Sequence, residues 1–237
     1  MWKLIGKEIK GIQYGKCWYE NDSGKRALFK PMTENKIKIE LAYYEVCVHL
    51  GISCTKVEAA EFEGVTGILS YDIGKSRFLF LEGEEIKTGD KIKTGISFRE
   101  LSVNMSEKEQ TKFADMVFAD TLLQNSDRHS ENFKLRVSNS GKIIGLLDLF
   151  DHDQAFMFED PDDYYLFRWD TDVEWESFER AIKLAYRDFP DRINNLVCKT
   201  KELPEDIYSY EFIMERLKWI ESMIYENKDK KNKTGAP

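Results

Sequence analysis

Residues 125–133, NSDRHSENF, and residues 146–156, LLDLFDHDQAF, are the most informative part of the sequence. Asp127 precedes Asn132 by five positions, and Asp151 follows an apolar run nineteen positions after Asn132. Phosphoryl transfer needs one carboxylate at the acceptor hydroxyl and separate oxygen ligands that hold Mg²⁺ against the phosphates. An Asp and an Asn at this spacing can point to either side of a phosphate, and an Asp after the next strand can complete the metal site.

The alternative is that these residues only stabilise a loop, because Asp, Asn and His tolerate turns and cap backbone groups. The surrounding pattern favours chemistry. Ser106 and Glu109 form a capping box that predicts a helix to about Gln124, with Phe113, Met116, Val117 and Leu123 among its apolar members. Two short strands, at 133–137 and 142–150, then follow the polar loop at once.

A phosphate site of this kind also needs a cation, and Lys30 is the candidate. It closes a predicted β-hairpin, in which CWYE and RALFK flank the turn NDSGK. The next segment predicts an amphipathic helix that ends at Gly51, with apolar residues at helical spacing. These are Ile37, Leu41, Tyr44 and Val48. Glu40 in this helix is the natural ion-pair partner of Lys30, and Glu45 is its competitor.

The segment GIQYGK, with Gly11, Gly15 and Lys16, precedes the hairpin. Glycines let backbone amides approach phosphates, but they equally serve turns, so this signal is weak. The segment does not match the Walker A pattern. Lys16 could add a second phosphate contact.

Composition excludes several classes of protein. The chain has 237 residues and a formal net charge of -8, which disfavours direct binding to nucleic acid. No apolar run approaches the roughly 18 residues of a membrane-spanning helix. The four cysteines contain no CxxC pair, and no signal peptide is evident, so we expect a cytoplasmic protein with reduced thiols. Zinc-site spacings of Cys and His are missing as well.

The pattern predicts an α+β fold with two lobes. Residues 1–84 form a β-rich N-lobe with a glycine loop, a sheet and one helix. Residues 85–226 form a helical C-lobe that carries the catalytic and metal-binding loops, and residues 227–237 form a disordered tail.

In this order the elements resemble the HipA-like serine/threonine kinases, whose fold is related to phosphatidylinositol 3-/4-kinases. The resemblance covers about residues 8–225. It rests on the glycine loop, the strand lysine, the helix glutamate before HLGI, and the segments GILSYDI and FLFLEGEEI. Its most specific parts are DRHSEN and the following LFD.

The resemblance implies ATP and Mg²⁺ as cofactors and a Ser or Thr hydroxyl of a protein as acceptor. It implies Asp127 as the catalytic aspartate, with Asn132 and Asp151 as the Mg²⁺ ligands. The implied ATP-binding residues are Gly11, Gly15, Lys16, Lys30, Glu40, Glu82, Gly83, Glu84 and His129, with residues 82–84 near the adenine-binding hinge. It also brings in a small antitoxin-type DNA-binding protein as a possible partner.

Three departures from the family pattern bear on these expectations. Asp148 stands where relatives often have Pro, so Asp148, Asp151 and Asp153 compete as the metal ligand, and register favours Asp151. Residues 7–16 contain no Ser or Thr that could be phosphorylated as a switch. The sequence printed here has no counterpart of the extra N-terminal subdomain of long HipA proteins, so we expect the compact form of the family.

Other functions use the same pattern. A small-molecule or phosphoinositide kinase would share the catalytic residues. A lipid kinase, however, needs a basic patch that faces the membrane, and this acidic chain gives little support for one. A pseudokinase would bind nucleotide without turnover. A toxin held silent by an antitoxin protein is compatible with kinase activity.

Overall fold

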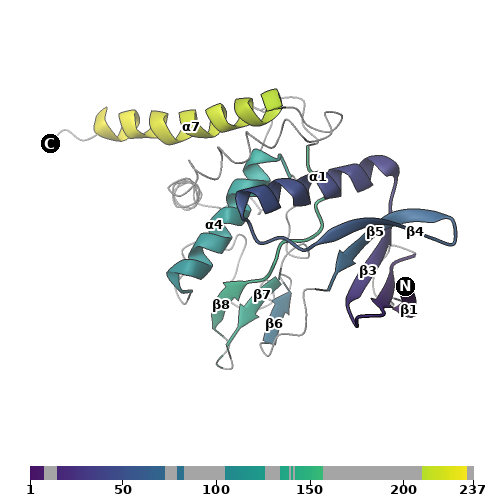
Figure 1. Ribbon diagram of the computed structural model, residues 1–237. Coiled ribbons are helices and arrows are strands. Elements are labelled where there is room, and N and C mark those ends of the chain that lie inside the picture. The colour runs from purple at the N-terminus through teal and green to yellow at the C-terminus, as the bar shows by residue number, and fades with distance from the viewer. Residues whose placement is uncertain are drawn as a thin grey trace.

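The computed structural model describes residues 1–7, 15–72, 79–82, 105–125, 134–138, 140, 142–156 and 210–233. In chain order, its elements are β1 (Trp2–Lys7), β2 (Cys17–Asn21), β3 (Arg26–Pro31), α1 (Glu34–Leu50), β4 (Val57–Phe62), β5 (Val65–Tyr71), β6 (Leu79–Glu82), α4 (Glu107–Leu122), β7 (Lys134–Val137), β8 (Ile143–Leu146) and α7 (Tyr210–Lys233) (Figure 1). No helix in these ranges is both long enough and apolar enough to cross a membrane. The mixture of antiparallel strands and helices agrees with the α+β prediction.

The first sheet is antiparallel and has the strand order β1-β2-β3-β5-β4. The predicted hairpin between β2 and β3 is confirmed. In its turn the Asn21 side-chain oxygen accepts hydrogen bonds from the backbone amides of Ser23 (3.0 Å) and Lys25 (2.9 Å). Gly24 adopts φ +75°, which glycine tolerates without strain. This tight turn fixes the register that places Lys30 on β3.

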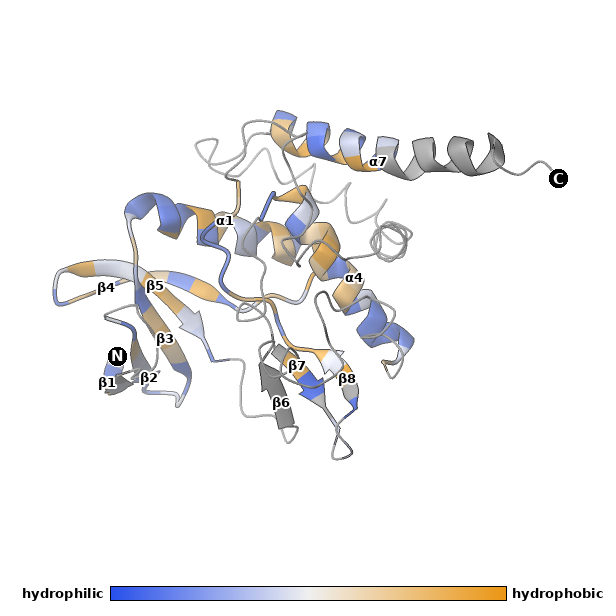
Figure 2. Cartoon of the chain, turned by 180° about the vertical axis from the view of Figure 1, so that it is seen from behind, coloured by the Kyte–Doolittle hydropathy of each residue, from blue (hydrophilic) through white to orange (hydrophobic). Residues whose placement is uncertain are grey.

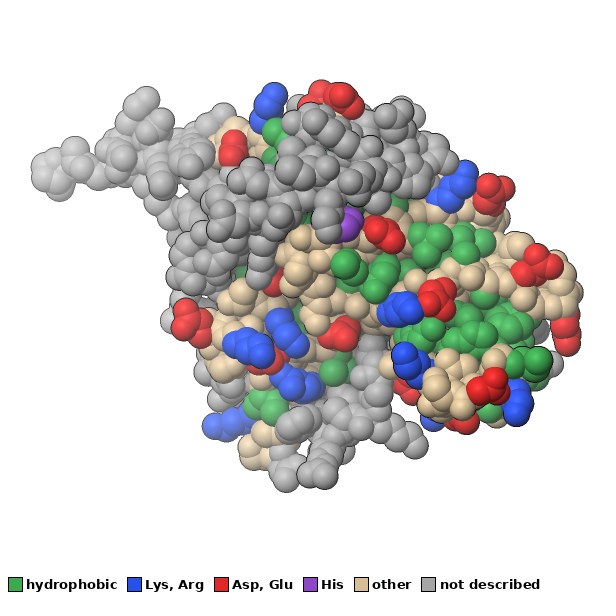
Figure 3. All heavy atoms as spheres, viewed as in Figure 1, with side chains coloured by type: hydrophobic (Ala, Val, Ile, Leu, Met, Phe, Trp, Pro, Cys, Tyr) green, Lys and Arg blue, Asp and Glu red, His purple; other side chains and the backbone are tan. Residues whose placement is uncertain are grey.

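The two faces of this sheet differ. Alternation along β3 puts Lys30 on one face and Phe29 on the other. Phe29 belongs to a small buried cluster with Ala27 and Leu69, around which lie partly buried aromatic residues. These are Trp2, Tyr19, Phe62 and Tyr71. Figure 3 shows hydrophobic side chains gathered over this part of the molecule.

Helix α1 begins after Thr33 and ends at Gly51, which adopts the left-handed conformation (φ 66°) as predicted. The predicted buried face was wrong, because Val48 is 51% exposed. The buried face instead carries Ile39, Glu40, Tyr43, Val46, Cys47 and Leu50. Both sets of residues have helical spacing. The apolar periodicity predicted burial of the face that has no charged residue, whereas the face that packs in the core includes Glu40.

Helix α4 starts as predicted, with the Ser106 hydroxyl accepting a hydrogen bond from the Glu109 amide at 3.4 Å. In a capping box the Glu109 carboxylate would also accept a hydrogen bond from the Ser106 amide, but here it has partners in the second sheet. The Glu109 carboxylate forms an ion pair with Arg136 of β7 and accepts a hydrogen bond from the Leu146 amide (3.2 Å). A side chain at Gly145 would clash with both partners of this ion pair. Glu109 therefore joins α4 to the second sheet.

The second sheet is also antiparallel, with the order β6-β7-β8. Strand β6 lies within the segment predicted as the N-lobe, residues 1–84, yet it pairs with β7 from the second half of the chain. Strand β6 therefore satisfies its backbone groups in the second sheet, although it lies within residues 1–84. The predicted boundary itself, at 84/85, lies outside the described residues.

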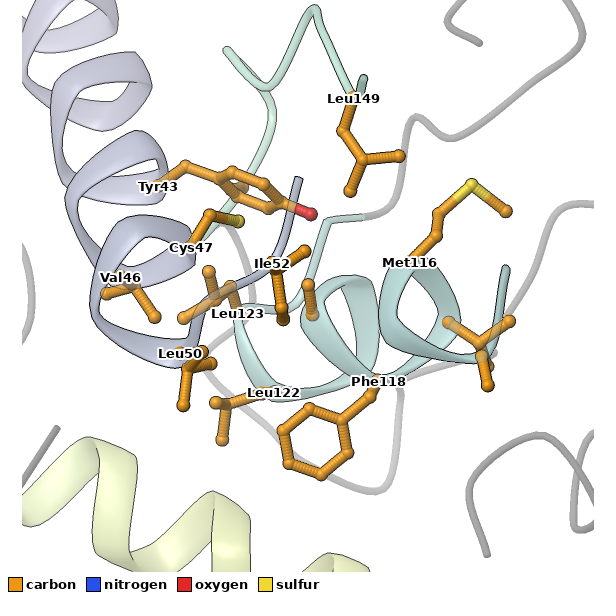
Figure 4. Close-up of a cluster of buried hydrophobic side chains, with 14 of the residues drawn as sticks. Tyr43, Val46, Cys47, Leu50, Ile52, Met116, Phe118, Leu122, Leu123 and Leu149 are labelled. Carbon is orange, nitrogen blue, oxygen red and sulfur yellow. The ribbon is translucent and has the colours of Figure 1, made fainter. Parts of the chain in front are cut away.

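The main core joins the two halves of the chain. Figure 4 shows side chains of α1, α4 and the segment around Leu149 packed into one cluster. In both Figure 1 and Figure 2, α1 lies between the first sheet and α4, and α7 lies above α4. Helix α7 adds Ile213, Leu217 and Ile220 to the same cluster.

Helix α7 continues to Lys233, so residues 227–233 do not belong to the disordered tail that was predicted to start at 227. Glu and Lys are good helix formers, and lysines near a helix C-terminus interact favourably with the helix dipole. A charged run that follows an anchored helical segment can therefore extend it.

Gly67 of β5 provides the first test of this fold. It faces Pro31 across the ladder, and a Cβ there would clash with the Lys30 backbone carbonyl. We expect Gly67→Ala to lower the free energy of unfolding by about 2 kcal/mol, because overpacking must move β3. Gly6→Ala is the control, since a Cβ at Gly6 meets nothing within 4 Å. Urea unfolding that gives equal stabilities for the two variants would contradict the close approach of β5 to Lys30.

Candidate active site

Lys30 projects from β3 into a nearly closed environment. Its side chain is only 6% exposed, on the face of the sheet that also carries Ile68. Its ammonium Nζ donates a hydrogen bond to Asp151 Oδ1 at 2.9 Å. A buried ammonium group without a charged partner would be very unfavourable, so this contact between distant parts of the sequence is a strong constraint.

Asp151 is held by a segment that pairs with the connection between α1 and β4. The Leu149 amide donates to the Ser53 carbonyl (3.2 Å), and the Thr55 amide donates to the Leu149 carbonyl (2.7 Å). Asp151 itself has φ 62°, an uncommon conformation for a residue with a side chain. Backbone strain of this kind clusters at functional sites, because the surrounding structure must maintain it.

The three carboxylates that compete as metal ligand have different partners. Asp148 accepts a hydrogen bond from the Ser53 hydroxyl (2.6 Å), and Asp153 forms an ion pair with Lys36 (2.6 Å). Asp151 is the one whose carboxylate contacts Lys30, and its side chain is 27% exposed. The geometry thus gives Asp151 the central position that its register in the sequence favours.

Glu40 lies on the buried face of α1 and is fully buried. Neither of its carboxylate oxygens has a partner with good hydrogen-bond geometry among the described residues, although the backbone of His152 is close enough to lower the pKa of this carboxyl. The predicted ion pair with Lys30 is not formed directly, because Lys30 contacts Asp151 instead. Its competitor Glu45 is exposed and lies 3.8 Å from His49 Nε2, so of the two glutamates Glu40 is the one near the site.

The charges in this cluster influence one another. Burial raises the pKa of Glu40 to about 7, although the positive charge of Lys30 opposes this rise. Burial by itself would lower the pKa of Lys30, but the carboxylates of Asp151 and Glu40 outweigh it and the net direction is upward. Lys30 therefore stays charged while Glu40 changes its protonation near neutral pH.

The structure adds two residues that the sequence did not single out for the site. His152 is buried, and its ring stacks on Tyr43 of α1 with centroids 3.7 Å apart. Its Nε2 also lies 3.4 Å from Cys54 Sγ. The Tyr43 hydroxyl donates to Asp120 of α4 at 2.8 Å. The three-residue spacing from Glu40 to Tyr43 was a usable signal, whereas nothing in the sequence indicated His152 as a packing residue.

Several predicted site residues lie outside the described residues, and their roles remain predictions. These are Gly11, Gly83, Glu84, Asp127, His129 and Asn132. Of the others, Gly15 adopts φ +106° close to Pro31, and Lys16 is half-buried. Glu82 ends β6 opposite Lys134, in a different sheet from Lys30. Within the described ranges, no group of three His, Cys, Asp or Glu residues could hold one metal ion.

The five-stranded sheet with a buried lysine, the helix with a buried glutamate and the aspartate after β8 belong to one kinase-like fold. This fold resembles that of the proinflammatory kinase CtkA of Helicobacter pylori. The TM-score is 0.59 at 15% sequence identity, and the match covers 93% of this chain and 94% of CtkA. At this identity the match shows the fold, and it confirms at that level the resemblance inferred from the sequence.

A second match is the HipA–HipB–operator DNA complex of Shewanella oneidensis MR-1. Its TM-score is 0.48 at 15% identity, and the match covers 90% of this chain and 64% of that chain. No protein-family model matches the sequence, and no curated protein matches it.

The buried carboxylate of Glu40 gives a prediction about stability. When an acidic group has a higher pKa in the folded state than in the unfolded state, the free energy of unfolding of the protein decreases as pH rises between the two pKa values. That window runs from the ordinary value of 4.5 to about 7. Glu40→Gln should therefore match the wild type near pH 4.5 and exceed its stability by up to about 3 kcal/mol above pH 7.

The matched control is Glu45→Gln, which removes an exposed carboxylate from the same helix. We expect its stability to stay within about 0.5 kcal/mol of the wild type at every pH. Urea unfolding of the nucleotide-free protein across this pH range measures both variants. If the stability difference between Glu40→Gln and the wild type does not grow with pH, the pKa of Glu40 is not raised in the folded state.

Proposed function

We propose that this chain is an ATP- and Mg²⁺-dependent kinase that transfers the γ-phosphoryl group to a Ser or Thr hydroxyl of a protein. The observation that carries the proposal is the contact between Lys30 and Asp151, with Glu40 buried behind it. A buried cation beside a partly exposed carboxylate suits phosphates on one side and a divalent cation on the other. The fold shared with CtkA supports the reaction class.

Lys30 would bind phosphate oxygens of the nucleotide. The carboxylates of Asp151, its present partner, and of Glu40 both raise the pKa of its ammonium group. If Asp151 turns its oxygens toward a metal ion, Lys30 still has Glu40 as an acceptor on the helix side. The burial of Glu40 and the effect of the Lys30 charge, which lowers the pKa of this carboxyl, support this second position. Glu40 would then keep the ammonium group in place when its contact with Asp151 is lost.

The donor set also suits Mg²⁺, which prefers oxygen ligands and usually binds through one or two carboxylates plus substrate phosphates. Asp151 would supply one ligand, and the predicted Asn132 a second. Bound Mg²⁺ would neutralise the charge that develops on the phosphates. Asp127 would accept the proton of the acceptor hydroxyl, so the chain contributes mainly positioning and electrostatic stabilisation. A protein acceptor and an antitoxin-type DNA-binding partner belong to this proposal.

The catalytic assignment is tested with variants of two neighbouring carboxylates. We expect Asp151→Asn to reduce phosphate transfer by at least about 100-fold, because it removes a charged metal ligand and the partner of Lys30. Asp153→Asn is the matched control, since Asp153 has its own partner in Lys36. It should retain activity within about threefold. Equal losses in both variants would show that the metal site is not centred on Asp151.

The assay uses the purified chain with labelled ATP, Mg²⁺ and a cell lysate, and follows where the label goes. Label in phosphoserine or phosphothreonine of a protein supports the proposal. Label in small molecules or lipids would identify the alternative kinase class. A rise in melting temperature with ATP and Mg²⁺, but without any transfer of label, would identify a pseudokinase.

A further inference from the structure

Tyr43 of α1 contacts two other parts of the chain that the proposed reaction needs in fixed positions, α4 and the loop that carries Asp151. It lies on α1, one turn after Glu40, and its side chain is fully buried. In Figure 4 its ring extends from α1 into the cluster of buried side chains, toward the segment that carries Leu149. The polar hydroxyl and the apolar face of the ring have different partners.

The polar end is joined to the C-terminal part of α4. The Tyr43 hydroxyl donates to Asp120 Oδ1 (2.8 Å), and the Asn125 amide group donates to the same oxygen (2.9 Å). Asp120 is 1% exposed and Asn125 is 3% exposed, so both bonds are protected from water. Hydrogen bonds to a buried carboxylate are stronger than those between neutral groups. Asn125 is the last described residue before Asp127, so these bonds hold the residue after which the predicted catalytic loop continues.

The face of the Tyr43 ring is joined to the loop that carries Asp151. The two rings of Tyr43 and His152 are almost parallel, at 8°. Because His152 directly follows Asp151, holding the imidazole restricts the backbone that keeps Asp151 in its left-handed conformation. The Phe156 amide donates to the Leu123 carbonyl at 2.9 Å and joins the same loop to the end of α4.

We propose that Tyr43 is a positioning residue that couples α1, which carries Glu40, to the Asp151 loop through its ring and to the start of the predicted catalytic loop through its hydroxyl. This inference rests on the proposed kinase function. A Phe would fill the same apolar space, so packing alone does not require the hydroxyl. Because the hydroxyl contacts Asp120 and the ring contacts His152, mutations can remove the first contact without the second.

Three variants separate these roles. Tyr43→Phe keeps the ring and removes the hydrogen bond to Asp120, whereas Tyr43→Leu removes both contacts. Tyr44→Phe is the matched control, because it removes a hydroxyl from the next residue of the helix, which lies outside the buried face. Each variant is first compared with the wild type for folding by its thermal melting curve, and rates are normalised to folded protein.

Steady-state phosphate transfer at varied ATP gives the first readout. Tyr43→Phe should lower kcat about tenfold and leave KM for ATP within about twofold, because the hydroxyl positions the start of the catalytic loop. Tyr43→Leu should also raise KM for ATP at least about fivefold, because the Asp151 loop loses its support. A Tyr43→Phe enzyme with the kcat of Tyr44→Phe, or a Tyr43→Leu enzyme with the KM of the wild type, overturns the proposal.

Proton NMR of the nucleotide-free protein gives a readout that does not depend on activity. The sequence has only three histidines, so the His152 ring signals are assigned with His152→Gln. Stacking on an aromatic ring shifts these signals upfield. We expect them to move toward the positions of free imidazole in Tyr43→Leu but not in Tyr44→Phe, and unchanged signals in Tyr43→Leu overturn the contact. A wild-type chain that transfers no phosphate would instead overturn the proposed function, with the NMR comparison still deciding the contact.

Discussion

The burial of the Lys30 ammonium group is the constraint on which the rest of the site depends. A charge with 6% exposure needs a close partner, and Asp151 provides it from a segment more than a hundred residues away in the sequence. The first sheet and the loop after β8 must therefore be assembled together. Gly67 allows β5 to approach the Lys30 backbone, and the pairing of Leu149 with residues 53–55 fixes the loop.

Helix α1 meets two requirements that oppose each other. It must bury apolar residues such as Val46 and Leu50 in the main core, and it must also carry Glu40 and Tyr43 on the same face. The apolar part stabilises the helix position, while the polar part reaches the site and α4. The unfavourable burial of Glu40 is tolerated because the core holds the helix in place, as is common where function and stability conflict.

Local sequence rules predicted much of the fold. The β2–β3 hairpin follows from its turn residues, and the ends of α1 and α4 follow from Gly51 and Ser106. Asp151 was identified by its register after an apolar strand, and the structure places it against Lys30. These features depend on a few neighbouring residues, so a single sequence contains them.

Tertiary choices were harder to predict. Apolar periodicity assigned the wrong face of α1, because it treats a charge such as Glu40 as a solvent-facing residue. Glu109 satisfied a capping box in sequence but uses its carboxylate to hold Arg136 and β8. The stacking of His152 on Tyr43 joins residues 109 positions apart, and only the assembled core brings them together.

The charges around Lys30 bear on which form of the nucleotide the proposed kinase would bind. Lys30 supplies a positive charge, Asp151 contacts it with a negative charge, and Glu40 adds a carboxyl group whose pKa burial raises to about 7. Asp153 forms an ion pair with Lys36 but still acts on the pKa of both Lys30 and Glu40. Among the described residues, carboxyl groups therefore outnumber ammonium groups around Lys30, and this would disfavour a free nucleotide with its own negative phosphates. In the proposed kinase, a metal ion bound to the nucleotide would offset part of this repulsion and offer Asp151 an alternative partner to Lys30, so the same electrostatics that assemble the site would favour the metal complex over the bare nucleotide.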